Sequence, residues 1–153
     1  MTPDELRPIL AEYRTRVSAG WSKATAHPDH DAADGSPVGQ CGVTSAWLQQ
    51  RLLEDHRVET YYCVGQLHHL TFTSPSPHCW LQFGRPNYAD RVVVDLTADQ
   101  VSGLEIHKAI CSTHVSLAVT QWLYYDDFAR LTAADLADDP VQRRLAILKG
   151  ALS

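Results

Sequence analysis

The chain has 153 residues, of which 44% are hydrophobic and 20% charged, and its formal net charge is −5. This length suits one domain with its own hydrophobic core, spanning residues 1–153. The negative charge, without any Lys/Arg cluster, argues against nucleic acid as a partner, because phosphate binding needs a basic surface. No apolar run is long enough for a membrane span or a signal peptide, which predicts a cytoplasmic protein with no membrane partner. In that compartment the four cysteines are expected to be thiols rather than disulfides.

The N-terminal segment carries the signals of a helix. Thr2 can cap it, Pro3 suits its first turn, and Glu5 can reach back to the cap. Apolar residues then recur at helical spacing until Gly20, which should end the helix. The polar segment 21–38 is long for a connection in a compact domain, so we expect either a functional loop, such as a lid, or a mobile one.

A Gly-rich turn leads into a second predicted helix, which begins at Cys41 and runs to about Asp55. Unpaired N–H groups at a helix start, together with the positive end of the helix dipole, favour a thiolate over a thiol. Cys41 is therefore a candidate nucleophile. The apolar stripe of this helix comprises Val43, Trp47, Leu48, Leu52 and Leu53.

Three segments rich in β-branched and aromatic residues predict strands at 58–65, 77–83 and 91–96. The turn sequence at 84–87 makes the last two antiparallel neighbours. Segment 67–76 fits either an extension of the first strand or a loop.

The C-terminal third has weaker signals. Residues 105–125 fit either strand or helix, and 127–136 suggest a short helix. Asp139 and Pro140 form a good cap and first-turn pair for a last helix through Leu152. The predicted buried stripe of that helix is Val141, Leu145 and Leu148.

Strand alternation brings two polar residues toward each other. His78 and Trp80 share one face of their strand, and Asp95 should face His78 from the neighbouring strand. A carboxylate in the apolar run Val92–Leu96 needs such a partner, because burying it unpaired is costly. Trp80 is expected to be core or pocket wall. Alternation points Cys79 away from His78, which argues against a catalytic role for it.

Cysteine, histidine and aspartate in these contexts predict a thiol-dependent acyl-transfer site that needs no metal or cofactor. Cys41 would attack an amide, ester or thioester carbonyl of a small-molecule or peptide/protein substrate. His78 would hold the thiolate and then protonate the leaving group, while Asp95 orients the imidazole. The N–H of Cys41, helped by the Gln40 amide, could form an oxyanion hole. Hydrolysis, deamidation and transfer to an amine all stay open.

These motifs resemble the bacterial YunG-like family, and the order of the three residues also resembles the transglutaminase-like core of papain-like thiol enzymes. Arylamine acetyltransferases and lasso-peptide leader proteases share that core. The resemblance implies an α+β fold in which the helix that begins at Cys41 packs on a small antiparallel sheet, flanked by N- and C-terminal helices. Cys79 departs from the pattern, because many transglutaminase-like proteins carry a small residue there. The matching residues are Trp21-Ser22-Lys23 with Thr25, Gly39-Gln40-Cys41 with Thr44, His78 with Trp80, Asp95-Leu96-Thr97 with Gln100, and a fainter match at 141–148.

Other interpretations compete with this one. Cys41 could be a buried structural thiol, and Asp90 or Asp99 could take the orienting role instead of Asp95. The chain could also be a non-catalytic binding module on the same fold. A third alternative is a zinc protein, in which His107, Cys111 and His114 lie on one face of a helix, with His68, His69 or Cys63 as the fourth ligand.

Overall fold

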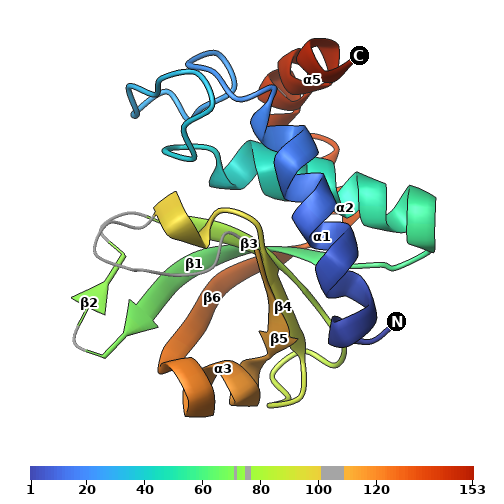
Figure 1. Cartoon of the computed structure of the whole chain (residues 1–153), viewed down its shortest axis with the longest axis vertical. Coiled ribbons are helices and arrows are strands. Elements are labelled where there is room, and N and C mark those ends of the chain that lie inside the picture. The colour runs from blue at the N-terminus through green and yellow to red at the C-terminus, as the bar shows by residue number, and fades with distance from the viewer. Residues whose placement is uncertain (71, 75–76, 101–108) are drawn as a thin grey trace.

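The computed structural model describes residues 1–70, 72–74, 77–100 and 109–153, and the fold is α+β as predicted. Helices α1 (Pro3–Ser18), α2 (Cys41–His56) and α5 (Val141–Leu152) lie together on one side of a curled antiparallel sheet (Figure 1). The helix that begins at Cys41 packs directly on the sheet, and the N- and C-terminal helices flank it. None of the described helices is long and apolar enough to cross a membrane.

The sheet has the strand order β2-β1-β3-β4-β5, and β6 pairs with the other edge of β1. Every pairing is antiparallel, and β3 and β4 are joined by the short turn that the sequence predicts. The strands are β1 (Tyr61–His69), β2 (Phe72–Thr73), β3 (His78–Phe83), β4 (Val92–Asp95), β5 (Ile110–Thr113) and β6 (Leu123–Leu131); the short helices are η1 (Ala98–Gln100), α3 (His114–Gln121) and α4 (Ala133–Leu136).

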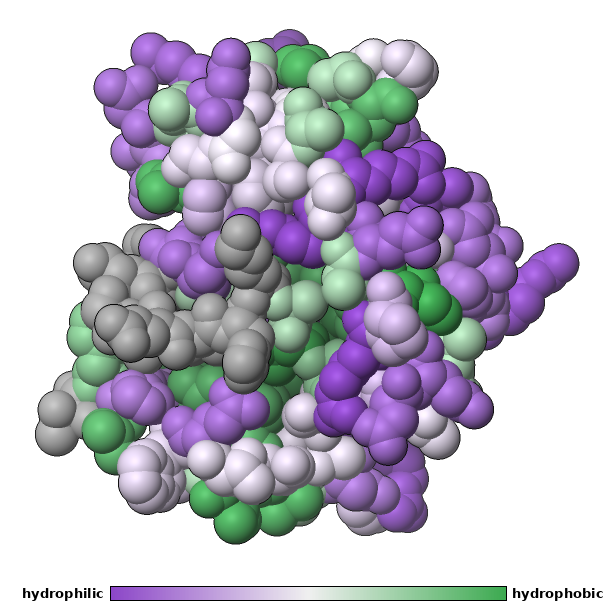
Figure 2. All heavy atoms as spheres, viewed as in Figure 1, coloured by the Kyte–Doolittle hydropathy of each residue, from purple (hydrophilic) through white to green (hydrophobic). Residues whose placement is uncertain are grey.

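Each face of the sheet has its own hydrophobic core. The first core joins the three long helices to the outward residues of β1, β3 and β4, such as Tyr62, Leu81 and Val94. The second core fills the inside of the curl around Trp80 and Tyr125, where α3 contributes Leu117. Hydrophobic atoms also reach the surface at the α3 end of the molecule (Figure 2), where α3 leaves apolar side chains exposed.

The helix signals of the sequence are confirmed at α1, where Thr2 and Glu5 form the reciprocal cap. Pro140 is the N-cap of α5 rather than its first residue, while the Asp139 carboxylate accepts a hydrogen bond from the Val141 N–H. The predicted stripe of α2 is buried except at Leu53, which is 36% exposed.

Two predicted elements differ from the structure. The first strand begins at Tyr61 rather than Val58, while its continuation to His69 is one of the two possibilities that the sequence left open for 67–76. Residues 127–136 are not one helix: β6 occupies Leu123–Leu131, and only Ala133–Leu136 are helical. The reason is long-range, since β6 completes the sheet beside β1 and buries Leu123 and Tyr125 on alternate positions.

Gly65 is needed where β1 passes closest to β6. The register of that pairing shifts between Val64 and Gly65. A Cβ at Gly65 would collide with the carbonyl oxygen of Asp126 and lie 2.7 Å from the Trp80 ring. The bulge and the second core therefore depend on a residue without a side chain.

We expect Gly65→Ala to lower the free energy of unfolding by about 3 kcal/mol or more, because backbone and ring must both move to admit the methyl group. The matched control is Gly150→Ala in α5, where a Cβ meets nothing within 4 Å. That variant should be neutral or more stable by up to about 1 kcal/mol. Urea denaturation of both variants measures the difference, and equal midpoints would contradict the packing argument.

Candidate active site

The start of α2 is fixed by a turn that only glycine fits well. Gly39 has φ +74°, and a Cβ there would lie 2.8 Å from Cβ of His30. Gln40 follows as N-cap, and its carbonyl accepts the first helical hydrogen bond from the Thr44 N–H. Cys41 is therefore the first residue of the helix, as the sequence predicts.

The side chain of Gln40 is buried and points to the preceding loop. Its Nε2 donates to the carbonyl of Ser22 at 2.9 Å, and its Oε1 accepts from Thr25 Oγ1 at 2.8 Å. A second contact joins the same loop to α2, because Trp21 Nε1 donates to Thr44 Oγ1 at 2.9 Å. The Gln40 amide thus anchors the loop, and the helix start has no side-chain cap. First-turn N–H groups without a cap can bind an anion or an oxyanion.

His78 and Asp95 meet in the interior, as alternation predicts. Each is 1% exposed, and His78 Nε2 lies 2.7 Å from Asp95 Oδ2. The carboxylate also accepts hydrogen bonds from the hydroxyl of Tyr125 and the N–H of Thr97, both at 2.8 Å. Burial by itself would raise the pKa of Asp95, but the charge and hydrogen bonds of these neighbours hold it below its ordinary value.

The imidazole of His78 is charged at neutral pH. Burial opposes its charge, but the charge and hydrogen bond of Asp95, together with Cys41, raise the pKa of His78 to about 10. Since Nε2 is bonded to Asp95, the hydrogen bond with Cys41 falls to Nδ1, which also lies 3.1 Å from Gln100 Nε2. Trp80 is fully buried and stacks beside the ring, with 6.1 Å between centroids. Trp80 therefore packs against the His78 ring and does not line the cavity beside Cys41.

Cys41 lies beside a second thiol, that of Cys79. A hydrogen bond with Cys79 is the largest cause of a Cys41 pKa well below the ordinary value; burial opposes it, and His78 and Gln100 add to it. The pKa of Cys79 is raised well above its ordinary value by the same bond and by burial. Its sulfur also accepts from the hydroxyl of Tyr62 at 3.3 Å. These opposite shifts, together with the position of Cys41 at the helix start, favour the thiolate at Cys41 and the thiol at Cys79.

Sequence reasoning missed two of these neighbours. The sequence prediction excluded Cys79 because strand alternation points its side chain away from His78. In the structure the side chains of Cys79 and His78 both reach Cys41, because the first residues of β3 lie beside the first residue of α2. Gln100 was noted only as part of a family resemblance. Its side chain comes from η1, which directly follows the β4 strand end.

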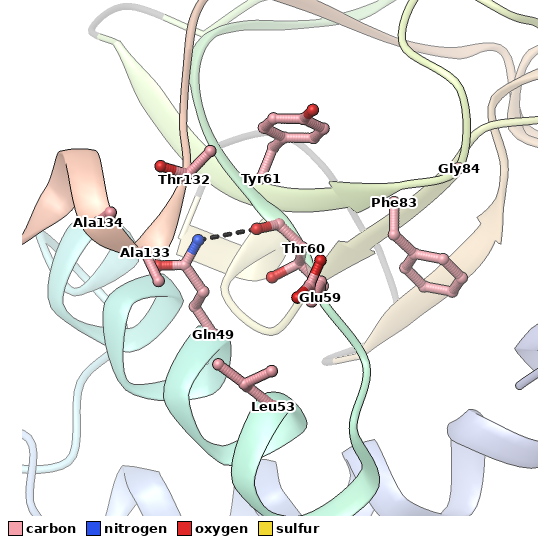
Figure 3. Close-up of a pocket in the computed structure, with 10 residues that line it drawn as sticks. All are labelled: Gln49, Leu53, Glu59, Thr60, Tyr61, Phe83, Gly84, Thr132, Ala133 and Ala134. Carbon is pink, nitrogen blue, oxygen red and sulfur yellow. Dashed lines mark hydrogen bonds between the residues drawn. The ribbon is translucent and has the colours of Figure 1, made fainter.

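A cavity of about 610 Å³ opens beside Cys41. Its walls come from the loop at His27–His30, the start of α2, the strands β1 and β3, Gln100, and the first residues of α5, including Arg144. The 21–38 loop is therefore one wall of the cavity. A smaller cavity of about 430 Å³ lies near the other end of α2, between Gln49 and Leu53 on the helix and Thr60 on the facing chain (Figure 3). That cavity contains none of the predicted site residues.

The geometry behind the zinc alternative is wrong for the residues that the structure describes. Cys111 lies in β5, and His114 is the first residue of α3, so they do not share a helix face. His107 lies outside the described residues. Within the described ranges, no group of three His, Cys, Asp or Glu side chains is placed to hold a metal ion.

The pH dependence of stability should reveal the Cys41 thiolate. Its lowered pKa contributes stability that is present above the unfolded value, 9.0, and is lost as pH falls through the folded value. We therefore expect the stability advantage of wild type over Cys41→Ser to grow by roughly 1 kcal/mol per pH unit as pH rises toward 9.

Cys111→Ser is the matched control for this measurement. Burial raises the pKa of Cys111 to about 11, so its thiol keeps its proton below pH 9 in both the folded and unfolded states. The Cys111→Ser variant should be less stable than wild type by the same amount at each pH from 6 to 9. If the free energies of unfolding of wild type and Cys41→Ser, measured by urea denaturation, change equally with pH, the thiolate assignment is contradicted.

No protein-family model, curated protein or solved structure matches the chain.

Proposed function

We propose that the chain is a cysteine-dependent acyl-transfer enzyme with a transglutaminase-like core, related to the YunG-like proteins that its motifs resemble. The observation that carries the proposal is the arrangement around Cys41. A low-pKa thiol begins an uncapped helix beside an imidazolium that a buried carboxylate holds. A structural thiol needs none of these features, whereas a nucleophile needs all of them.

In the proposed reaction the Cys41 thiolate attacks the carbonyl carbon of an amide, ester or thioester. The carbonyl oxygen becomes an oxyanion, for which the uncapped N–H groups of the first turn of α2 are the nearest donors. His78 gives its Nδ1 proton to the leaving group, so the acyl-enzyme forms beside a neutral imidazole. Water or an amine then attacks the thioester, His78 takes the proton of that nucleophile, and the thiolate leaves.

The other residues act through these groups. Asp95 orients the His78 ring and stabilises its positive charge. Hydrogen bonds from Tyr125 and Thr97 hold the Asp95 carboxylate in place. Gln100 lies between His78 and Cys41, where its amide can steady either the thiolate or the oxyanion. The substrate would be a small molecule or a peptide side chain, in keeping with a cavity of about 610 Å³. A cytoplasmic location would keep both thiols of the site reduced.

Alkylation by iodoacetamide at about pH 6 tests the nucleophile, because only a low-pKa thiol reacts well there. We expect one modified residue, Cys41, since burial raises the pKa of Cys63 to about 12 and of Cys111 to about 11. Replacing His78 with Gln should slow the reaction at pH 6 by about ten-fold or more. Equal labelling of all four cysteines, or a Cys41 that reacts only above about pH 8.5, would favour a non-catalytic binding module.

Acyl transfer itself is tested with p-nitrophenyl acetate as a probe ester. Mixing should release a burst of nitrophenol equal to the protein present and leave one acetyl group on the peptide that contains Cys41. The Cys63→Ser variant, altered at a buried thiol outside the site, should give the same burst, and Cys41→Ala should give none. A steady release that survives Cys41→Ala would overturn the proposal.

A further inference from the structure

One charge in the cavity beside Cys41 has no partner. Arg144 lines the cavity from α5 and is half-buried. It makes no ion pair or hydrogen bond with any residue that the structure describes. The two other described arginines at a buried or half-buried helix face, Arg14 and Arg51, both pair with carboxylates.

The acidic residues of the same cavity are already engaged. Asp139 accepts a hydrogen bond from the Val141 N–H at 2.9 Å and so caps α5. Asp29 belongs to the loop and lies 3.5 Å from His27 Nδ1, and both side chains are largely exposed. Cys41, His78 and Asp95 together carry one net negative charge, because Asp95 already pairs with His78. Among the described residues that line the cavity, Arg144 is the one Lys or Arg side chain, and it forms no ion pair with either lining aspartate.

The guanidinium lies over the start of α2. A Cβ on Gly42 would be 3.4 Å from Arg144 Nη2 and 3.1 Å from the hydroxyl of Tyr62. Gly42 follows the nucleophile directly, so a group bound by Arg144 is only a few atoms from the thiolate. The dipole of α2 adds a positive potential at the same point. The glycine thus leaves room for two polar groups to approach the first turn.

We propose that Arg144 is a specificity residue that binds a carboxylate of the acyl substrate. The inference rests on the proposed function and narrows its substrate class to anionic acyl compounds. The carboxylate would lie a short spacer away from the carbonyl that Cys41 attacks. A guanidinium suits this role, because it forms two parallel hydrogen bonds with a carboxylate and keeps its charge at every working pH. The hydroxyl of Tyr62 also borders Gly42, but it donates its hydrogen to Cys79 Sγ, so the hydrogen bonds to the carboxylate come from Arg144.

The test compares two alkylating reagents of nearly the same size at Cys41. Iodoacetate carries a carboxylate and iodoacetamide does not. With N-acetylcysteine as the reference thiol, we expect the ratio of iodoacetate to iodoacetamide rates at Cys41 to exceed the reference ratio by about ten-fold, as one charge-assisted hydrogen bond would give. Arg144→Gln should bring the ratio back toward the reference. The ratio is the readout, because any effect of the lost cation on the thiolate itself changes both rates together.

Arg143→Gln is the matched control, because it removes the same charge from the next residue of α5, which is exposed. It should leave the ratio unchanged. Arg144→Lys should give an intermediate ratio, since a lysine keeps the charge but loses the paired hydrogen bonds. If both Gln variants lower the ratio equally, the effect is a general surface potential and the inference is overturned.

Wild-type protein offers the same test without a variant. Butyrate should protect Cys41 from iodoacetamide at millimolar concentration, whereas butyramide should not. If Cys41 reacts rapidly with iodoacetamide but shows neither the raised ratio nor this protection, the proposed carboxylate site is wrong. The proposal that Cys41 is the nucleophile is then unaffected. If Cys41 reacts with neither reagent at pH 6, the proposed function fails, and this inference fails with it.

Discussion

The buried pair of His78 and Asp95 is the constraint on which the site depends. A carboxylate that is 1% exposed cannot stay ionised without a cation and several donors, and here it has His78, Tyr125 and Thr97. The carboxylate in turn keeps the imidazole charged, with a pKa of about 10. The charged ring then favours the thiolate of Cys41 over the thiol. One buried acid at the end of β4 therefore adds, through His78, to the effect of the Cys79 hydrogen bond on the ionisation of Cys41, which lies on a separate helix.

The start of α2 adds a second constraint, which is geometric. An N-cap residue usually caps its own helix through its side chain, and Gln40 does not. Its amide instead holds the 21–38 loop through Ser22 and Thr25, so the loop and the helix start form one unit. The uncapped start costs the helix some stability, but it leaves N–H groups free beside the nucleophile. Such a local loss of stability is expected at a functional site.

The sequence was sufficient for the parts of the site that follow from local periodicity. The pairing of His78 with Asp95 follows from strand alternation and from the cost of an unpaired acid, and Cys41 at a helix start follows from the glycines around it. Cys79 could not be placed in this way, because alternation fixes its face of β3 but not what lies above that face. The part of β6 from Asp127 onward was predicted as a short helix, because the pairing that makes it a strand is with β1, which is distant in sequence.

In the proposed function, chemistry and specificity come from different parts of this fold. The reacting groups lie on α2, β3 and β4, whose positions are fixed by two buried cores. Another part of the cavity wall comes from the loop and from α5, which brings Arg144. Under the proposal, a change at position 144 alters which substrate is held, while His78 and Asp95 keep their mutual hydrogen bond in the interior. The separation explains how a chain of 153 residues can hold a buried ion pair rigidly and still present a half-buried guanidinium for a ligand. In this proposal the sheet holds His78 and Asp95 in place, and the last helix binds the substrate.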